Sequence, residues 1–215
     1  MPLLEVQDLG VRRGDRWILR NLSFEVQEGQ AVGVVGPSGS GKTTLAWTLL
    51  GLLEAEEGEV RLDGLPWSAL VEGDRRPRRA EIQAVFQEPL ASLPPHRTGW
   101  EILEEPLVIH RRGSAPQRRE QAAAMAARVK FPEACLDQCP GQWSGGLAQR
   151  LSVARGLMSK PRLLVLDEPL SALDPTLASH LLQLFLELKA EGLALIFISH
   201  DPHAVGRLCD CTLDL

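Results

Sequence analysis

Residues 36–44 read GPSGSGKTT. They match the pattern G-x-x-x-x-G-K-[ST], in which a glycine-rich turn opens a helix and successive backbone N–H groups surround a phosphate. In this pattern the Lys42 ammonium reaches the β- and γ-phosphates, and the Thr43 hydroxyl is offered to Mg²⁺. We therefore predict a nucleoside triphosphate site. The expected nucleotide contacts from the loop are Gly36, Pro37, Ser38, Gly39, Ser40, Gly41, Lys42, Thr43 and Thr44.

The segments around this loop predict alternating strands and helices. AVGVVG (31–36) is almost wholly apolar and rich in Val, which is typical of a strand buried on both faces of a parallel sheet. A helix is expected from Lys42 to about Leu53. Further strands are expected at 3–9, 17–26, 57–64, 81–89, 162–169 and 193–199. This alternation favours an α/β core.

Residues 90–160 have a different sequence pattern. They contain helical patterns such as EILEEPLVIH and QRREQAAAMAARVKF, and apolar residues recur at helical intervals over 147–158. We expect a mainly helical block inserted into the α/β core. The whole chain, 1–215, is then a single domain, in which about 88–159 form the helical subdomain and about 1–87 with 160–215 form the rest.

A pair of carboxylates follows the apolar run in RLLVLDEP (162–169). The strand delivers Asp167 to the carboxyl edge of the sheet, where ligands bind in open α/β folds. We predict that Asp167 holds Mg²⁺, directly or through water. Glu168 is placed to orient and polarise an attacking water.

Two more polar residues end predicted strands in the same manner. His200 follows LALIFIS and is expected to donate a hydrogen bond to the γ-phosphate. Gln87 ends EIQAVFQ, where its amide can contact Mg²⁺ or its water. Both belong at the edge of the sheet that carries the phosphate loop.

A second anion-binding feature lies about a hundred residues beyond the first. QWSGGLAQR (142–150) places Ser144, Gly145, Gly146 and Leu147 at the start of a helix, whose N-terminus favours negative charge. Nothing near it in sequence can hold the rest of a nucleotide. We infer that this feature serves a nucleotide held by a different molecule.

Together these residues resemble the nucleotide-binding subunit of ATP-binding-cassette (ABC) transporters. GPSGSGKTT resembles the Walker A loop, LLVLDEP the Walker B strand with its catalytic Glu168, and WSGGLAQR the family signature. Gln87 stands at the Q-loop, Asp174 in SALD (171–174) at the D-loop, and His200 at the switch histidine. The matches occur in family order and cover nearly the whole chain.

The resemblance implies a RecA-like P-loop core, a small antiparallel β-subdomain near the N-terminus and a helical subdomain with the signature. It also implies ATP and Mg²⁺ as cofactors, with Lys42, Glu168 and His200 as catalytic residues. Two cassettes pair head to tail in this family, so each ATP is held between one chain's phosphate loop and the other chain's signature.

The family resemblance also predicts the partners and the location. We expect a second ABC ATPase subunit, membrane-spanning permease subunits and, indirectly, a solute-binding protein, at the cytoplasmic face of the cell membrane. The stretch 85–110 is similar to importers of oligopeptides, dipeptides and nickel. Two alternatives remain: a soluble ABC ATPase without a transport function, and a weakly hydrolysing regulatory cassette in a heterodimer.

Three features depart from the family pattern. The signature has Trp143 where Leu is usual and Leu147 where Gln is usual, which suggests unequal ATP sites in a heterodimer. The chain has no Tyr, so the adenine contact is expected from Arg13 or from Trp17. The chain stops at CDCTLDL, either as a minimal cassette or as a shortened one.

The bulk composition is that of a globular protein. The formal net charge of −5 argues against nucleic acid as a partner, and the basic clusters RRPRR (75–79) and RRGSAPQRR (111–119) are interpreted as solvated loop faces. No signal peptide is expected from MPLLEVQDLG, and no apolar run reaches the ~18 residues of a membrane span. The four cysteines are interpreted as reduced, partly buried thiols rather than zinc ligands.

Overall fold

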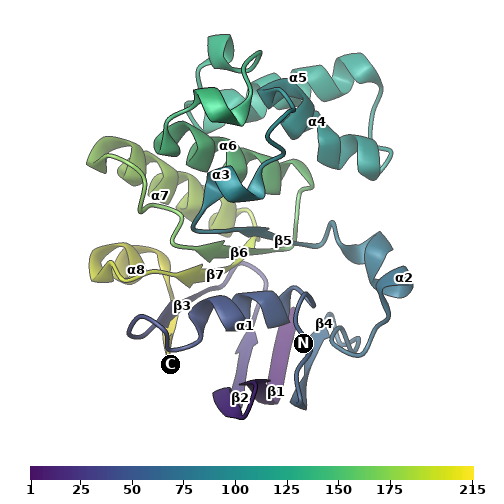
Figure 1. Ribbon diagram of the computed structural model, residues 1–215, viewed down its shortest axis with the longest axis vertical. Coiled ribbons are helices and arrows are strands. Elements are labelled where there is room, and N and C mark those ends of the chain that lie inside the picture. The colour runs from purple at the N-terminus through teal and green to yellow at the C-terminus, as the bar shows by residue number, and fades with distance from the viewer.

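The computed structural model describes residues 1–215 and contains two β-sheets (Figure 1). The larger sheet is parallel, with strand order β5-β6-β7-β3-β8. Its strands are β3 (Ala31–Val35), β5 (Ile82–Val85), β6 (Leu163–Asp167), β7 (Ala194–Ile198) and β8 (Cys211–Asp214). The smaller sheet is antiparallel, with order β2-β1-β4. Its strands are β1 (Leu4–Arg13), β2 (Arg16–Val26) and β4 (Glu57–Leu62).

Alternate side chains of the parallel strands enter two different apolar clusters, as the two-residue period of a strand requires. In β6, Leu163 and Val165 join the cluster that contains α1 (Lys42–Leu49) and the antiparallel sheet. Leu164 and Leu166 point to the opposite face, where α7 (Pro175–Ala190) and α8 (Pro202–Leu208) pack. The sheet is therefore covered on both sides, which explains why these strands are uniformly apolar.

The segment between β5 and β6 is helical and forms the upper part of the molecule in Figure 1. Its helices are α3 (Pro89–Ser92), α4 (Gly99–Ile109), α5 (Ala115–Arg128) and α6 (Gly145–Met158), with 3₁₀ turns at Glu133–Cys135 and Pro140–Gln142. One apolar cluster runs without a break from these helices to α7 and the sheet. The α/β core, the antiparallel β-subdomain and the inserted helices are thus confirmed, and the boundaries at 88 and 159 stay a prediction.

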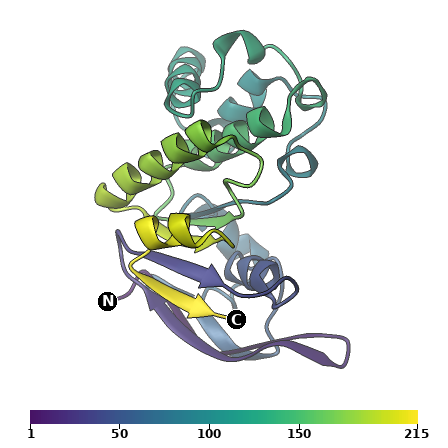
Figure 2. The same cartoon turned by 90° about the vertical axis from the view of Figure 1, so that its left-hand side faces the viewer.

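Three details differ from the sequence-based expectations. The helix after the phosphate loop ends at Leu49 rather than Leu53, because the chain turns at Gly51 with φ +66°. Two short elements, α8 and β8, follow His200 and were not predicted. Figure 2 shows β8, in yellow, running beside β3 in the same direction at the edge of the sheet.

The cluster RRPRR is not a solvated loop, which corrects that interpretation. Its first residue ends a short helix, α2 (Glu72–Arg75), and the next three form a 3₁₀ turn (Arg76–Arg78). The Arg75 guanidinium is buried and donates to the carbonyl oxygens of Gly51 and Leu70. Arg78 and Arg79 form ion pairs with Glu81 and Glu72. These arginines stabilise the link between β4 and β5.

RRGSAPQRR is likewise partly helical, since α5 begins within it and Ser114 caps that helix. Arg112 donates to the Ser159 carbonyl, and Arg119 pairs with Glu104 at 2.8 Å. No helix in the chain has both the length and the apolar character needed to cross a bilayer.

Candidate nucleotide site

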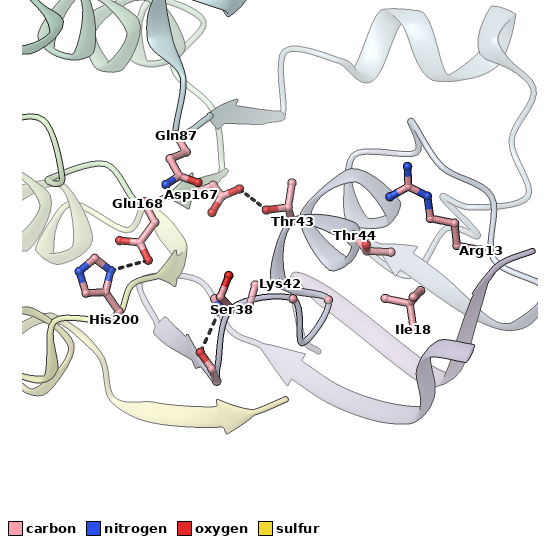
Figure 3. A pocket seen from close by; sticks show the side chains of 13 residues that line it. Arg13, Ile18, Ser38, Lys42, Thr43, Thr44, Gln87, Asp167, Glu168 and His200 are labelled. Atoms are coloured by element: carbon pink, nitrogen blue, oxygen red, sulfur yellow. Dashed lines mark hydrogen bonds and ion pairs between the residues drawn. The ribbon is translucent and has the colours of Figure 1, made fainter. Parts of the chain in front are cut away.

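The polar residues singled out above meet at one edge of the parallel sheet. The strands β5, β6, β7 and β3 are neighbours in that order, and all end at the same edge. Gln87 follows β5, Asp167 ends β6, His200 follows β7 and the phosphate loop follows β3. They line a cavity of about 430 Å³ (Figure 3). The lining residues are Arg13, Ile18, Gly36, Ser38, Gly39, Gly41, Lys42, Thr43, Thr44, Gln87, Asp167, Glu168 and His200.

The phosphate loop curls around the Lys42 ammonium. Lys42 Nζ donates to the carbonyl oxygens of Gly36 at 2.9 Å and Pro37 at 2.8 Å. Pro37 and Ser40 belong to the loop but do not line the cavity, and Ser40 Oγ is buried without a hydrogen-bond partner. The loop therefore offers backbone N–H groups and one ammonium to a bound anion.

Thr43 joins the loop to the carboxyl end of β6. Its Oγ1 donates to Asp167 Oδ2 at 2.8 Å. Burial raises the pKa of the Asp167 carboxyl above its ordinary value, an effect that the hydrogen bond from Thr43 opposes. A hydroxyl and a carboxylate oxygen are thus held side by side, and the Gln87 amide lies in the same cavity.

Glu168 and His200 are hydrogen-bonded at the opposite end of the cavity from Arg13 (Figure 3). Glu168 Oε1 lies 2.9 Å from His200 Nδ1. This contact raises the pKa of His200 through the hydrogen bond and the carboxylate charge. The Glu168 carboxylate is largely buried, with 11% of its side chain exposed, whereas 77% of the His200 side chain is exposed.

The end of the cavity opposite Glu168 and His200 is formed by the β1–β2 hairpin. The base of a nucleotide is expected at this end, which we call the base end. Arg13 and Ile18 reach the cavity from this hairpin (Figure 3). Trp17 does not line it: its ring lies under the Arg12 guanidinium, 4.0 Å from the ring centroid. Of the two residues expected to contact adenine, the structure brings only Arg13 to the cavity. Ile18, which the sequence analysis missed, carries no chemical signal beyond its place as the third residue of β2.

The signature residues lie outside this cavity. Ser144 caps α6, its Oγ accepting from the Leu147 backbone N–H at 3.3 Å, and both Ser144 and Gly145 are exposed. A Cβ on Gly146 would lie 3.1 Å from the Ala172 carbonyl oxygen, so the first turn of α6 packs against the segment 171–174. Asp174 caps α7 by accepting from Thr176 and Leu177 backbone N–H groups.

Trp143 is part of the helical packing. It is buried, with 6% exposed, and meets Phe131 edge-on with a 5.4 Å separation of ring centroids. Its indole Nε1 donates to the Cys135 carbonyl. The indole is thus a core residue, and its hydrogen bond holds the turn Glu133–Cys135 against the residue before Ser144.

Comparisons with known proteins identify the family of the chain. The family model described as ABC transporter matches residues 19–171. A second model, described as an AAA domain, matches the shorter stretch 147–206.

Among curated proteins, the chain is 37% identical over 226 residues to the oligopeptide transport ATP-binding protein OppF of Escherichia coli, covering 98% of this chain and 68% of OppF. It is 40% identical over 193 residues to the dipeptide transport ATP-binding protein DppF of Haemophilus influenzae, covering 89% and 59%.

Solved structures of the same fold include two dimers of the cassette MJ0796, both 29% identical to this chain. The dimer in a post-hydrolysis state bound to ADP and Pi superposes with a TM-score of 0.89 over 95% of this chain and 90% of that one. A second dimeric structure has a TM-score of 0.91 over 98% and 94%. With a family model matched over most of its length and such relatives along nearly all of it, the chain belongs to the ABC transporter family and is an ABC ATPase.

Proposed function

We propose that this chain is the ATP-hydrolysing subunit of an ABC importer of peptides, and that its cavity holds ATP. The observation that carries the proposal is the gathering of Lys42, Thr43, Asp167, Glu168 and His200 around one cavity at the carboxyl edge of the sheet. Phosphoryl transfer needs little covalent help from a protein, so positioned charges and donors supply most of the catalysis.

The roles of the catalytic residues follow from their places. The phosphate loop and Lys42 bind the β- and γ-phosphates. Glu168 is largely buried beside the cavity, where it can accept a hydrogen bond from the attacking water. Glu168 holds His200 through Nδ1, and His200 would donate to the γ-phosphate through its other ring nitrogen. Lys42 and His200 then balance the charge that develops during hydrolysis.

The residues present fit Mg²⁺. Thr43, Asp167 and Gln87 would hold it, since they offer hydroxyl, carboxylate and amide oxygens, and Mg²⁺ is usually bound by one or two protein ligands together with phosphates and waters. When bound, the ion supplies charge neutralisation for the β- and γ-phosphates. The Thr43–Asp167 hydrogen bond keeps the two oxygens in place for it.

A second copy or a related cassette completes the ATP site in this proposal. The Ser144-Gly145-Gly146 helix start is exposed and lies outside the chain's own cavity, and the MJ0796 structures of the same fold are dimers. Ser144 and the α6 N-terminus would therefore bind the γ-phosphate of the partner's nucleotide. Asp174 lies next to this surface and would take part in the contact between the two cassettes.

A permease would dock at a hollow that shares Gln87 with the nucleotide cavity. This hollow, of about 360 Å³, is lined by Thr43, Trp47, Phe86, Gln87, Glu88, Ala91, Ser92 and Asp167. Trp47 is 44% exposed there. A large apolar side chain that is exposed at a hollow is typical of a surface that a partner protein covers. A segment of a membrane-spanning subunit seated in the hollow would report its position to Gln87, and the chain would lie peripherally at the cytoplasmic face of the membrane.

Peptides are the favoured cargo because OppF and DppF, named for oligopeptide and dipeptide transport, match along most of this chain. A hydrolysing subunit is favoured over a regulatory cassette because the chain retains all four polar residues expected to take part in hydrolysis: Lys42, Asp167, Glu168 and His200. A solute-binding protein would deliver the peptide to the permease.

The test is uptake in a strain of the source organism from which the gene has been deleted. We expect loss of radiolabelled tripeptide uptake, restored by the wild-type gene but not by K42A. Nickel uptake in the same strains is the control for cargo. Normal peptide uptake in the deletion strain contradicts the proposed cargo, and full rescue by K42A contradicts the need for hydrolysis.

A further inference from the structure

The signature helix α6 contains a buried amide without a hydrogen-bond partner. Gln149 is fully buried, and neither its Oε1 nor its Nε2 makes a hydrogen bond in the chain. The next residue, Arg150, is also buried, but its guanidinium donates to the carbonyl oxygens of Gly146 and Lys130. Burial of an unpaired amide costs free energy, and an apolar side chain of the same length would avoid this cost. The glutamine therefore calls for a specific reason.

The Gln149 side chain belongs over the first turn of α6. Side chains of a helix lean toward its N-terminus and cover the residues three and four positions earlier, which here are Gly146 and Gly145. Both glycines lie against Ala172. A Cβ on Gly146 would be 3.1 Å from the Ala172 carbonyl oxygen, and a Cβ on Gly145 would be 3.8 Å from the Ala172 Cβ. The buried amide is thus a neighbour of the segment 171–174.

The Ala172 carbonyl is an acceptor of the kind that the amide lacks. It lies outside every helix and strand, and no backbone N–H donates to it. Its segment is tied to the nucleotide cavity through Ser171, whose N–H and Oγ both donate to the Glu168 carbonyl oxygen, at 3.3 and 3.0 Å. Glu168 itself lines that cavity (Figure 3). The place of the Glu168 carboxylate therefore depends on the place of the segment that carries Ala172.

We propose that Gln149 is a positioning residue for ATP hydrolysis and that it acts through Glu168. When ATP is hydrolysed, Gln149 Nε2 donates to the Ala172 carbonyl oxygen. This bond holds the segment 171–174 on the first turn of α6 and, through Ser171, fixes Glu168 beside the attacking water. In the chain without nucleotide the amide is buried and unpaired, so Gln149 lowers the stability of that state. The inference rests on the proposed function, because it takes the cavity to be the ATP site.

The first measurement is thermal unfolding of the purified chain without nucleotide. Q149M replaces the amide with an apolar group of similar length, so it is expected to raise the Tm by about 2 °C or more. L151M is the matched control. Leu151 is fully buried in the same helix, and methionine there exchanges one apolar side chain for another of similar volume. Its Tm is expected to equal that of wild type or to fall.

The second measurement is ATP hydrolysis by the assembled complex. Q149M is expected to lower kcat by about tenfold, on the order of what one hydrogen bond contributes. KM for ATP is expected to stay within about twofold, because Gln149 does not line the cavity. L151M is expected to keep kcat within about twofold of wild type. A purely structural role moves stability and turnover in the same direction, whereas Q149M is expected to move them in opposite directions.

A double variant tests whether Gln149 acts through Glu168. E168Q lacks the carboxylate that Gln149 is proposed to position. In that background Q149M is therefore expected to change the residual kcat by less than about twofold, so the two losses do not multiply. Independent roles would instead lower kcat by about a further tenfold.

The outcomes separate this inference from the proposed function. Absence of ATP hydrolysis by the wild-type complex contradicts the proposed function itself. Where the wild-type complex hydrolyses ATP, any one of three results overturns the role of Gln149 alone. These are a Q149M Tm equal to or below that of wild type, a Q149M kcat within about twofold of wild type, and a further loss of about tenfold in the E168Q background.

Discussion

Glu168 Oε1 lies 2.9 Å from His200 Nδ1, so a residue that follows β6 and a residue that follows β7 are joined across the edge of the sheet. The contact fixes His200 through Nδ1 and leaves its second ring nitrogen without a partner in the chain. We expect E168Q to lower ATP hydrolysis by about 10²-fold or more, because an amide cannot act as a general base. Nucleotide affinity is expected to remain, since the phosphate loop and Thr43 are unchanged.

The measurement is phosphate release by the assembled complex, together with nucleotide affinity of the same E168Q protein. K42A is the matched control, and it is expected to lose affinity as well as turnover. Turnover of E168Q within about threefold of wild type would show that Glu168 does not act on the water.

The backbone at Glu168 is strained. Its φ is +51°, in the left-handed region that a residue with a Cβ rarely adopts, and its N–H donates to the Ile198 carbonyl at 3.0 Å. E168G and E168A both lack the carboxylate and differ only in the Cβ. We expect E168G to be about 1 kcal/mol more stable than E168A, although both are inactive.

Urea unfolding measures this difference, with E187G and E187A as the control pair. Glu187 is exposed in α7, where glycine is expected to be the less stable of the two by about 1 kcal/mol. If E168G is no more stable than E168A, the positive φ does not store strain.

Asp167 is expected to make the free energy of unfolding depend on pH. Burial raises its pKa, so the folded chain binds the proton more tightly than the unfolded chain does. The free energy of unfolding therefore falls as the pH rises from the ordinary aspartate value, about 4, through the raised folded value, and stays low above it. D167N cannot ionise and keeps a hydrogen bond acceptor for Thr43. We expect it to be more stable than wild type at pH 7, with the advantage shrinking toward pH 4.

Urea unfolding at several pH values, without Mg²⁺ or nucleotide, measures this advantage. T43V is the control: it removes the donor that lowers the Asp167 pKa, and is expected to destabilise the chain at pH 7. A D167N advantage that does not change with pH would mean that the ionisation of Asp167 has no part in it.

Substitution of Trp143 is expected to lower the free energy of unfolding of the chain. Because the indole is buried against Phe131, W143A is expected to lower the free energy of unfolding by about 3–5 kcal/mol. W143F keeps a ring and loses the hydrogen bond to Cys135, so a loss of about 1–2 kcal/mol is expected. Thermal unfolding of the three proteins tests this order, and equal stability of W143A and wild type would contradict it.

The sequence predicts the phosphate end of the site well and the base end poorly, for a physical reason. Asp167 ends a buried strand, and Lys42 and His200 come after two others. Parallel strands bring their carboxyl ends to one edge whatever the details of packing. Trp17 and Arg13 lie on a hairpin. The side of the sheet to which each of these side chains points depends on the pairing register of the two strands. Three register shifts interrupt the pairing of β1 with β2, so alternation along the sequence does not decide which of the two faces the cavity.

The same limit applies to the short elements. β8 has four residues that are mostly exposed, and α8 has seven, so neither gives a periodic signal. The burial of Arg75 was missed because a run of arginines is typical of solvated surface. Its burial depends on carbonyl oxygens of Gly51 and Leu70, which the sequence does not place nearby.

Cys209 is expected to be chemically inert in the folded chain. All four cysteines are free, but Cys209 follows α8 and lies against Gly33, and its burial raises the thiol pKa to about 12. At pH 8.5 its thiolate fraction is then about a thousandfold below that of an ordinary thiol, and alkylation by iodoacetamide slows accordingly. The exposed Cys211 is expected to react fast. Mass spectrometry of C211S, native and in urea, isolates Cys209, which should be labelled only when the chain is unfolded. Rapid native labelling would show that the α8–β8 corner opens without global unfolding.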